Sequence, residues 1–303
     1  MGFRIPVLLP FYLKTKKTKL MKIPIPAFLP KAPAFSGLIA CMFSASAPAA
    51  LVSFNTTTDN TTKDLYTDAT ATTAYTTATN NGQVTVGNNT AEAADNTAVW
   101  ASLAETYTLA NAGDSLLLSG NVQLTGITTA SGEFRFGLFD QGSSVNANGW
   151  LGYWASNDNV TGSGVGEFRE RNSPNTGFYV SGTGATALTS YSGATVDITS
   201  GTHYYYQIQL TLNSLGGIDY SADLYEVADS SRVLLSVSGT DSTPNTYAFG
   251  RAGFLLGNNL NADQANFTNT DATFSPVPEP SAAVLGGLGT IGWVLGFRRR
   301  RLA

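Results

Sequence analysis

An alternation of apolar and polar residues constrains this 303-residue chain more than any other feature. Along residues 203–212, every even position holds Tyr, Ile or Leu, and most odd positions hold polar residues. Because successive side chains of a strand point to opposite faces, this pattern predicts an antiparallel strand with one buried face. Residues 213–217, Asn-Ser-Leu-Gly-Gly, then predict a hairpin loop, after which a second strand returns over 220–227.

The rest of the body repeats this period. Phe134, Phe136 and Leu138 share one face of a predicted strand. Further candidate strands cover 105–110, 115–126, 149–155, 165–171, 232–238, 248–256 and 267–274. No stretch sustains a helical 3.6-residue period over three turns. The sequence therefore predicts one all-β domain over residues 83–276, a single two-sheet antiparallel sandwich.

Three segments of this body resemble the concanavalin A-like jelly roll. Residues 134–140 and 252–257 are similar to inner strands of that fold, and residues 265–274 are similar to its closing strand. The resemblance is one of pattern, without a signature motif. It implies a jelly-roll sandwich of the kind found in lectins and glucanases.

The N-terminal region is expected to be removed. Residues 1–50 have the plan of a secretory signal peptide: from Met21, a basic region leads to the apolar run 34–43 and then to small residues. Residues 38–41, Leu-Ile-Ala-Cys, also resemble a lipoprotein lipobox, but the apolar run continues beyond them. Residues 51–82 are rich in Thr and Asn, which predicts a loose arm or an irregular edge.

Residues 277–303 combine three elements in order: Val-Pro-Glu-Pro-Ser, the apolar run 282–297, and four arginines. As a transmembrane helix, the apolar run would span roughly 24 Å at about 1.5 Å per residue, slightly less than the hydrocarbon core. The arginines would keep this end in the cytoplasm, so that the body lies outside.

This order resembles the PEP-CTERM sorting signal of Gram-negative bacteria. The resemblance implies recognition by exosortase, a membrane enzyme that would cut near the Pro-Glu-Pro triplet and discard the helix, much as a GPI signal loses its tail. The residues concerned are the sorting motif Pro278, Glu279 and Pro280, and the membrane-stop and orientation residues Arg298, Arg299, Arg300 and Arg301. A plain single-span anchor beside a chance triplet is the alternative.

Charge and composition exclude several classes of function. Residues 51–276 hold 20 Asp and Glu against 6 Lys and Arg, a formal net charge of −14, whereas the whole chain carries −4. Nucleic-acid binding needs Lys and Arg to neutralise phosphates, so no nucleic-acid partner is expected. The single Cys excludes a disulfide framework and a multi-cysteine zinc site. We expect no cofactor and no metal.

The body offers no constellation typical of an enzyme. The Glu-x-Asp-x-Glu pattern of jelly-roll glucanases is absent. The nearest groupings are Glu167 with Glu170 and Asp219 with Asp223, which we expect to be exterior charges. His203 has no Gly-x-Ser-x-Gly elbow to supply a nucleophile. We therefore expect a non-enzymatic protein.

Two groupings are candidates for ligand contact. Trp150 and Trp154 flank Gly152 on one face of a short strand and could stack on sugar rings, although core packing is the commoner use of tryptophan. Asp263 lies near three asparagines, but calcium sites usually hold more than one carboxylate, so we expect a simple turn there.

These features predict an exported, non-enzymatic protein of the envelope or extracellular matrix of a Gram-negative bacterium. It would be held transiently in the inner membrane and then sorted to the cell surface or matrix. The expected partners are exosortase, the export machinery and extracellular polysaccharide. Two alternatives stay open: a glycan-binding, lectin-like module, and an exosortase-sorted glycan hydrolase.

Overall fold

The structure, a computed structural model, describes most of the body of the chain. The described residues are 48–54, 65–67, 75–79, 82–87, 97–127, 133–143, 147–157, 166–173, 182–191, 198–257, 260 and 262–278. The chain divides into two units, Met1–Cys41 and Met42–Ala303, and all described residues belong to the second.

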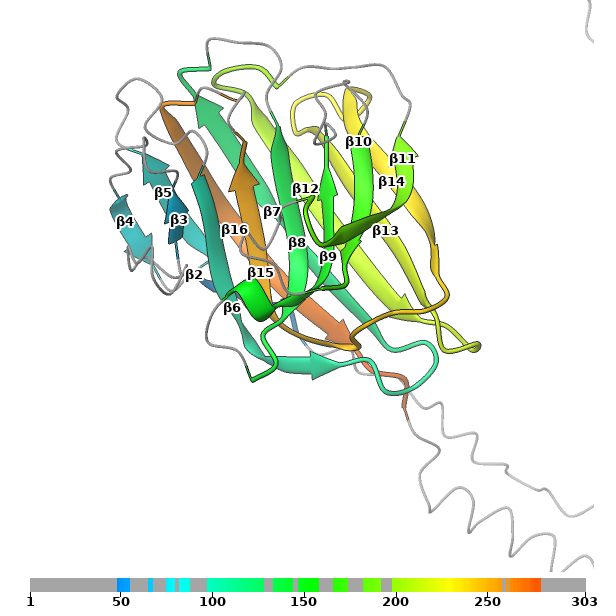
Figure 1. The fold of residues 1–303 in the computed structure, drawn as a ribbon. Coiled ribbons are helices and arrows are strands. Elements are labelled where there is room, and N and C mark those ends of the chain that lie inside the picture. The colour runs from blue at the N-terminus through cyan, green and yellow to red at the C-terminus, as the bar shows by residue number, and fades with distance from the viewer. Residues whose placement is uncertain are drawn as a thin grey trace, which may run out of the picture. The chain divides into compact units, whose positions relative to one another are not determined.

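Two antiparallel eight-stranded sheets face each other (Figure 1). Sheet A has the order β14-β13-β12-β7-β16-β5-β4, with β1 beside β16. Its strands are β1 (Ala50–Leu51), β4 (Tyr75–Thr79), β5 (Gln83–Gly87), β7 (Ser115–Thr125), β12 (His203–Leu212), β13 (Ile218–Glu226), β14 (Val233–Asp241) and β16 (Gln264–Ser275).

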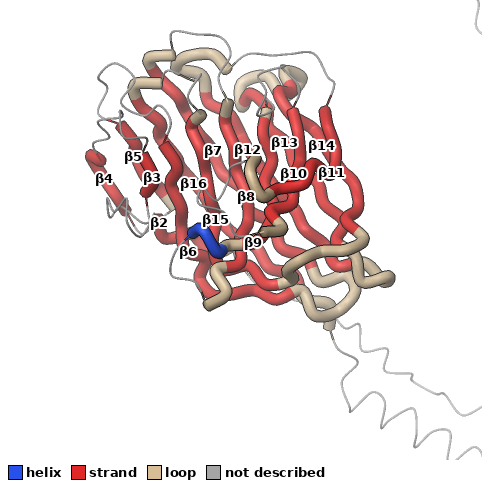
Figure 2. The backbone as a smooth tube through the Cα atoms, viewed as in Figure 1, coloured by secondary structure: helices blue, strands red, loops and turns tan. Residues whose placement is uncertain are grey.

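Sheet B has the order β11-β10-β9-β8-β15-β6-β2, with β3 beside β6. Its strands are β2 (Ser53–Phe54), β3 (Leu65–Thr67), β6 (Thr97–Thr108), β8 (Phe134–Asp140), β9 (Leu151–Ser156), β10 (Gly166–Arg171), β11 (Ala185–Tyr191) and β15 (Ala248–Leu256). Among the described residues, the one helical element is the short 3-10 turn η1 (Ala147–Gly149), as Figure 2 shows.

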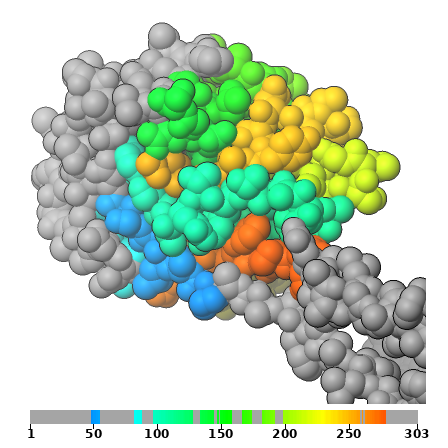
Figure 3. Space-filling view, turned by 90° about the horizontal axis from the view of Figure 1, so that it is seen from below, coloured from blue at the N-terminus to red at the C-terminus, as the bar shows by residue number. Residues whose placement is uncertain are grey.

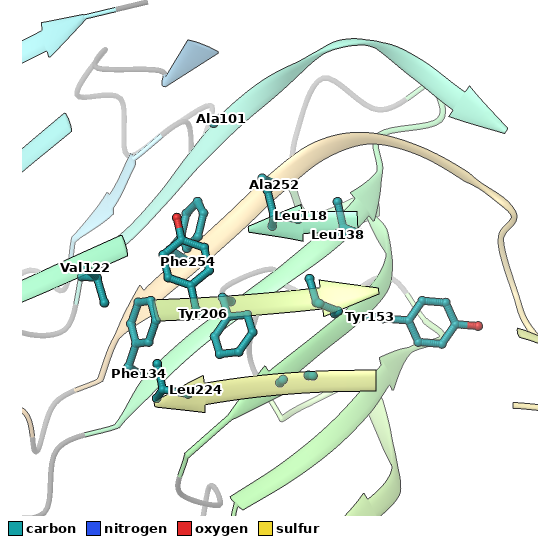
Figure 4. Close-up of a cluster of buried hydrophobic side chains, with 14 of the residues drawn as sticks. Ala101, Leu118, Val122, Phe134, Leu138, Tyr153, Tyr206, Leu224, Ala252 and Phe254 are labelled. Atoms are coloured by element: carbon teal, nitrogen blue, oxygen red, sulfur yellow. The ribbon is translucent and has the colours of Figure 1, made fainter. Parts of the chain in front are cut away.

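The main core lies between the inner faces of the two sheets (Figure 4). Phe134 and Phe254 of sheet B pack against Tyr206 and Phe267 of sheet A, and all four side chains are buried. The ring centroids of Phe254 and Phe267 lie 4.9 Å apart. Because large rings bury the most apolar area, these contacts between the sheets are a main source of the stability of the sandwich.

An irregularity in β16 gives a buried hydroxyl its partner. The register with β7 shifts between Thr268 and Asp271, and Asn269 between them has a positive φ of 53°. Thr270 is fully buried at this point, and its Oγ1 lies 2.6 Å from the hydroxyl oxygen of Tyr206. The pair therefore avoids the cost of burying a hydroxyl without a hydrogen bond.

The two antiparallel sheets confirm the predicted all-β sandwich. The segments predicted from residue 115, 203 and 248 onward coincide with β7, β12 and β15 within a residue. Strand β11 was not predicted, because its sequence Ala-Thr-Ala-Leu-Thr-Ser-Tyr contains few large apolar residues. The short strands β1 to β4 lie in or beside the expected arm 51–82 and pair with both sheets.

Candidate functional site

The C-terminal sorting segment begins directly at one end of the sandwich. Strand β16 ends at Ser275, and two residues later the backbone N–H of Val277 donates to Oδ1 of Asp114 at 2.7 Å. A Cβ on Gly113 would lie 2.7 Å from Cγ2 of Val277, so this side chain also packs against the β6–β7 turn. The residue before Pro278 is therefore held on the folded body.

Asp114 is buried at this junction, with 2% of its surface exposed, and its carboxylate accepts several hydrogen bonds. Its Oδ2 accepts the backbone N–H groups of Ala110 at 2.9 Å and Asn111 at 2.7 Å. Burial alone would raise the pKa of Asp114, but the hydrogen bonds from Val277, Asn111 and Ala110 outweigh it and hold the pKa below its ordinary value. The carboxylate is therefore charged at neutral pH and closes the turn onto the C-terminal strand.

The remaining predicted sorting residues lie outside the described part of the chain. Pro278 is described and exposed. Glu279, Pro280, the run 282–297 and Arg298–Arg301 are not, and neither is the signal segment up to residue 47. In the ranges that the structure does describe, no helix has the length and apolar character needed to cross a bilayer.

The two predicted glycan-contact tryptophans are both buried, Trp150 with 1% and Trp154 with 0% of its surface exposed. They lie on the outer face of sheet B, in a second cluster that is separate from the main core. Trp100 joins them there, with its ring centroid 5.6 Å from that of Trp150 in an edge-to-face arrangement. In this arrangement none of these three tryptophan rings presents an open face on which a sugar could stack.

The register of sheet B places two glycines between two of these tryptophans. Across the sheet, Trp100 pairs with Gly253, Gly253 with Gly137, Gly137 with Trp154, and Trp154 with Arg169. A Cβ on Gly137 would lie 2.7 Å from Cβ of Trp154, so a larger residue there would collide with the tryptophan. Between Trp100 and Trp154, the outer face of sheet B therefore carries no side chain at the positions of Gly253 and Gly137.

Arginines are concentrated on this same face. Of the six Lys and Arg between residues 51 and 276, four lie here: Arg135, Arg169, Arg171 and Arg251. The guanidinium carbon of Arg135 lies 4.5 Å from the ring centroid of Trp154, and that of Arg251 lies 4.9 Å from the ring centroid of Trp100. Burial lowers the pKa of Arg171 to about 10. We call Trp100, Trp150, Trp154 and the four arginines the Trp/Arg face.

Carboxylates balance part of this positive charge. Glu133 Oε1 lies 2.5 Å from Nε of Arg135, and Glu167 Oε1 lies 2.8 Å from Nε of Arg169. The interpretation of Glu167 and Glu170 as exterior charges was wrong, because both are buried, with 3% and 4% of their surface exposed. Alternation along β10 explains the difference in their partners, since Glu167 faces the arginines and Glu170 faces the inside of the sandwich.

Glu170 belongs to a buried polar network that joins the two sheets. Asn245 donates to it twice, from its backbone N–H at 2.7 Å and from its side-chain amide at 2.9 Å. The hydroxyl of Tyr153 donates to Oδ2 of Asp241 at 2.8 Å and lies 3.4 Å from Glu170 Oε1. Burial raises the pKa of both Glu170 and Tyr153. This network connects β9 and β10 of sheet B to the end of β14 in sheet A.

The other polar candidates stand apart from one another. Asp219 is exposed and accepts from Asn213 and Thr240 on the outer face of sheet A. His203 is exposed at the start of β12. The described residues contain no group of three or more His, Cys, Asp or Glu side chains that could hold a metal ion. The asparagines near Asp263 lie outside the described residues.

Comparison with known proteins identifies the C-terminal segment. Residues 276–301 match the PEP-CTERM protein-sorting motif. This motif indicates an exported protein that is anchored transiently in the membrane and processed by exosortase. No curated protein sequence matches the chain.

Solved structures with similar architecture include lectin-like and carbohydrate-binding sandwiches and an alginate lyase. Arcelin-5, a lectin-like defense protein from Phaseolus vulgaris, is 10% identical, with a TM-score of 0.43 over 70% of this chain and 96% of that chain. The lectin UEA-II, complexed with galactose, is 9% identical, with a TM-score of 0.41 over 76% and 99%. The carbohydrate-binding module CBM66 from Bacillus subtilis is 11% identical, with a TM-score of 0.37 over 69% and 94%.

Proposed function

We propose that this chain is an exported, non-enzymatic protein of the bacterial envelope or extracellular matrix, delivered to the cell surface by exosortase. One observation carries the proposal: the sorting motif follows β16 directly, and Val277 is bonded to the sandwich through Asp114. Every described strand ends before Pro278, so a cut near the Pro-Glu-Pro triplet would leave the folded domain whole.

The polar groups of the sandwich support a structural role. A general acid or base must reach a substrate to transfer a proton. Glu170 and Asp241 are instead enclosed between the sheets and engaged by Asn245, Thr243 and Tyr153. We interpret these carboxylates as cross-links of the fold.

The test is the C-terminal peptide of the mature protein, measured by mass spectrometry in an exosortase-bearing host. We expect wild-type surface molecules to lack Arg298–Arg301 and the Glu279→Ala variant to stay membrane-bound and uncut. Glu226→Ala, at the far end of β13, is the matched control and should be processed normally. Arg298–Arg301 on most wild-type surface molecules would contradict sorting by exosortase. Polysaccharide cleavage that Glu170→Gln abolishes would contradict the non-enzymatic role.

Glycan binding is the second candidate, and the Trp/Arg face favours it. Guanidinium groups beside tryptophan rings suit acidic sugars, because the cation pairs with a carboxylate and the ring packs on the sugar. Binding would require the covered rings of Trp100 and Trp154 to open. A glycan array with the mature domain tests this idea, comparing Arg169→Ala with Arg232→Ala, an arginine outside the Trp/Arg face. Equal binding by both variants would exclude the Trp/Arg face as the site.

A further inference from the structure

Charge is distributed unevenly between the two ends of the sandwich. The end from which the C-terminal segment leaves, here called the anchor end, is formed by the turns β6–β7, β12–β13 and β14–β15, by the described parts of the connections β8–β9 and β10–β11, and by residues 276–278. The opposite end, the far end, holds the β13–β14 turn and the described parts of the connections β7–β8, β11–β12 and β15–β16. Figure 3 views the molecule from the anchor end.

The described turns of the anchor end carry little exposed charge. The turns 109–114, 213–217 and 242–247 contain no Glu, Lys, Arg or His, and their one Asp is the buried Asp114. Exposed acids begin only in the adjoining strands, at Glu105 and Asp219. In the far-end connections, the described acidic residues are Glu133, Asp229 and Asp263, and Asp229 is exposed. On a body with a net charge of −14, the described turns of the anchor end are therefore poor in exposed acidic groups.

Exposed apolar side chains gather at the same end. Leu215 is 94% exposed at the tip of the β12–β13 turn, and Tyr247 and Val277 are 37% and 38% exposed. Hydrogen bonds join the turns that carry them. The hydroxyl of Tyr247 donates to the carbonyl of Gly216 at 2.8 Å, and the N–H of Gly113, beside Val277, donates to the carbonyl of Leu212 at 2.7 Å. These three residues therefore belong to one continuous surface.

The length of the connecting chain keeps this surface close to a membrane. Val277 is fixed to Asp114, and the apolar run of the sorting segment begins five residues later, at Ala282. Five extended residues reach at most about 17 Å. At physiological salt, the electrostatic screening length is about 8 Å, which is roughly half of this reach. Within a screening length, exposed acidic groups would be repelled by anionic lipids, so turns that lack exposed charge favour close approach to the bilayer.

We infer that, before processing, the sandwich stands end-on against the outer surface of the lipid bilayer, with its anchor end in contact with the headgroups and Leu215 inserted among them. The inference rests on the transient membrane anchoring by the sorting segment. Tyr247 suits the same position, because tyrosine has an apolar ring and a polar tip and prefers the membrane interface. The acidic far end then points away from the membrane.

The experiment uses the full chain in vesicles of phosphatidylethanolamine and phosphatidylglycerol. With the natural cysteine removed by Cys41→Ser, an environment-sensitive fluorophore is attached through Leu215→Cys or, as the matched control, through Val227→Cys. Val227 is 51% exposed and lies at the far end, so neither change disturbs the core. We expect lipid-borne quenchers to quench the label at position 215 several-fold more strongly than the label at position 227.

Flotation of the same vesicles separates the possible failures. A chain that floats with its vesicles but shows equal quenching at both positions would overturn the end-on contact while leaving anchoring intact. A chain that does not float would overturn both. A third outcome is that the fluorescence of the label at position 215 changes only after exosortase is added. This would also overturn lipid contact and would assign the surface to the enzyme.

Discussion

The two ends of the sandwich differ in how several of their acidic residues are used. At the anchor end, Asp114, Glu170 and Asp241 turn inward, where they accept hydrogen bonds from backbone and side-chain donors of the turns. At the far end, Asp229 bonds within its own turn in full contact with solvent, and Glu226 pairs with the partly exposed Arg232. Using carboxylates as buried structural acceptors therefore leaves fewer exposed charges in the turns of the anchor end.

The largest expected effect separates the two kinds of apolar residue at the anchor end. Trp150→Ala should destabilise the domain by roughly 3–5 kcal/mol, because it removes a buried ring that packs on Trp100 and Phe139. Leu215→Ala at the same end should leave the melting temperature unchanged, since that side chain is exposed. An unchanged melting temperature for Trp150→Ala together with weaker glycan adsorption would favour the lectin-like alternative instead.

A second effect compares one acid from each end. Asp114→Ala removes the acceptor of three backbone N–H groups from a buried position, and we expect it to cost about 2–3 kcal/mol. Asp229→Ala, its control at the far end, should not change the denaturation midpoint measurably. Equal midpoints for the two variants would show that the inward carboxylates do not support the anchor end.

The third prediction concerns pH, because two acids at the anchor end have pKa shifts of opposite sign. Because the pKa of Asp114 is lowered by folding, this residue stabilises the fold at pH values above its pKa in the unfolded chain. The contribution is lost as pH falls through its pKa in the folded protein. Because the pKa of Glu170 is raised by folding, this residue stabilises the fold at pH values below its pKa in the unfolded chain. The contribution is lost as pH rises through its pKa in the folded protein.

Melting curves of Glu170→Gln test the sign for that residue. The variant cannot ionise, so it avoids the cost of a buried charge at neutral pH. The melting temperature of the variant minus that of wild type should therefore be larger near pH 7 than near pH 4, which is the ordinary titration range of a carboxyl group. The opposite order would mean that the charged form of Glu170 is the one that the fold prefers.

The smallest expected effect is on processing in the cell. Leu215→Glu places a charge on the anchor end and should slow removal of the C-terminal segment by a few-fold, because the body can no longer approach the membrane closely. Val227→Glu adds the same charge at the far end and should be processed at the wild-type rate. Pulse-chase analysis of the two precursor forms measures this difference, and equal rates would remove the anchor end from the pathway.

Several features of the site could not have been read from the chain. Glu167 and Glu170 differ in their partners because β10 faces the arginines on one side and Asn245 on the other. Trp100 was not predicted as a neighbour of Trp150, since only the pairing of β15 with both β6 and β8 brings that part of the sheet together. The alternating Arg135 beside Phe134 and Phe136 was the available signal that the outer face of β8 carries cations.

By itself, the sequence determined the local properties of this protein. The two-residue period specifies strands with one buried face, and the order of triplet, apolar run and arginines specifies the sorting segment, because both depend on residues close together in the chain. The tertiary structure alone decided which acids are buried, which tryptophans are covered and which turns share an end. The bond from Val277 to Asp114 joins residues 163 positions apart, and burial and hydrogen bonding at such distances depend on how the sheets pack.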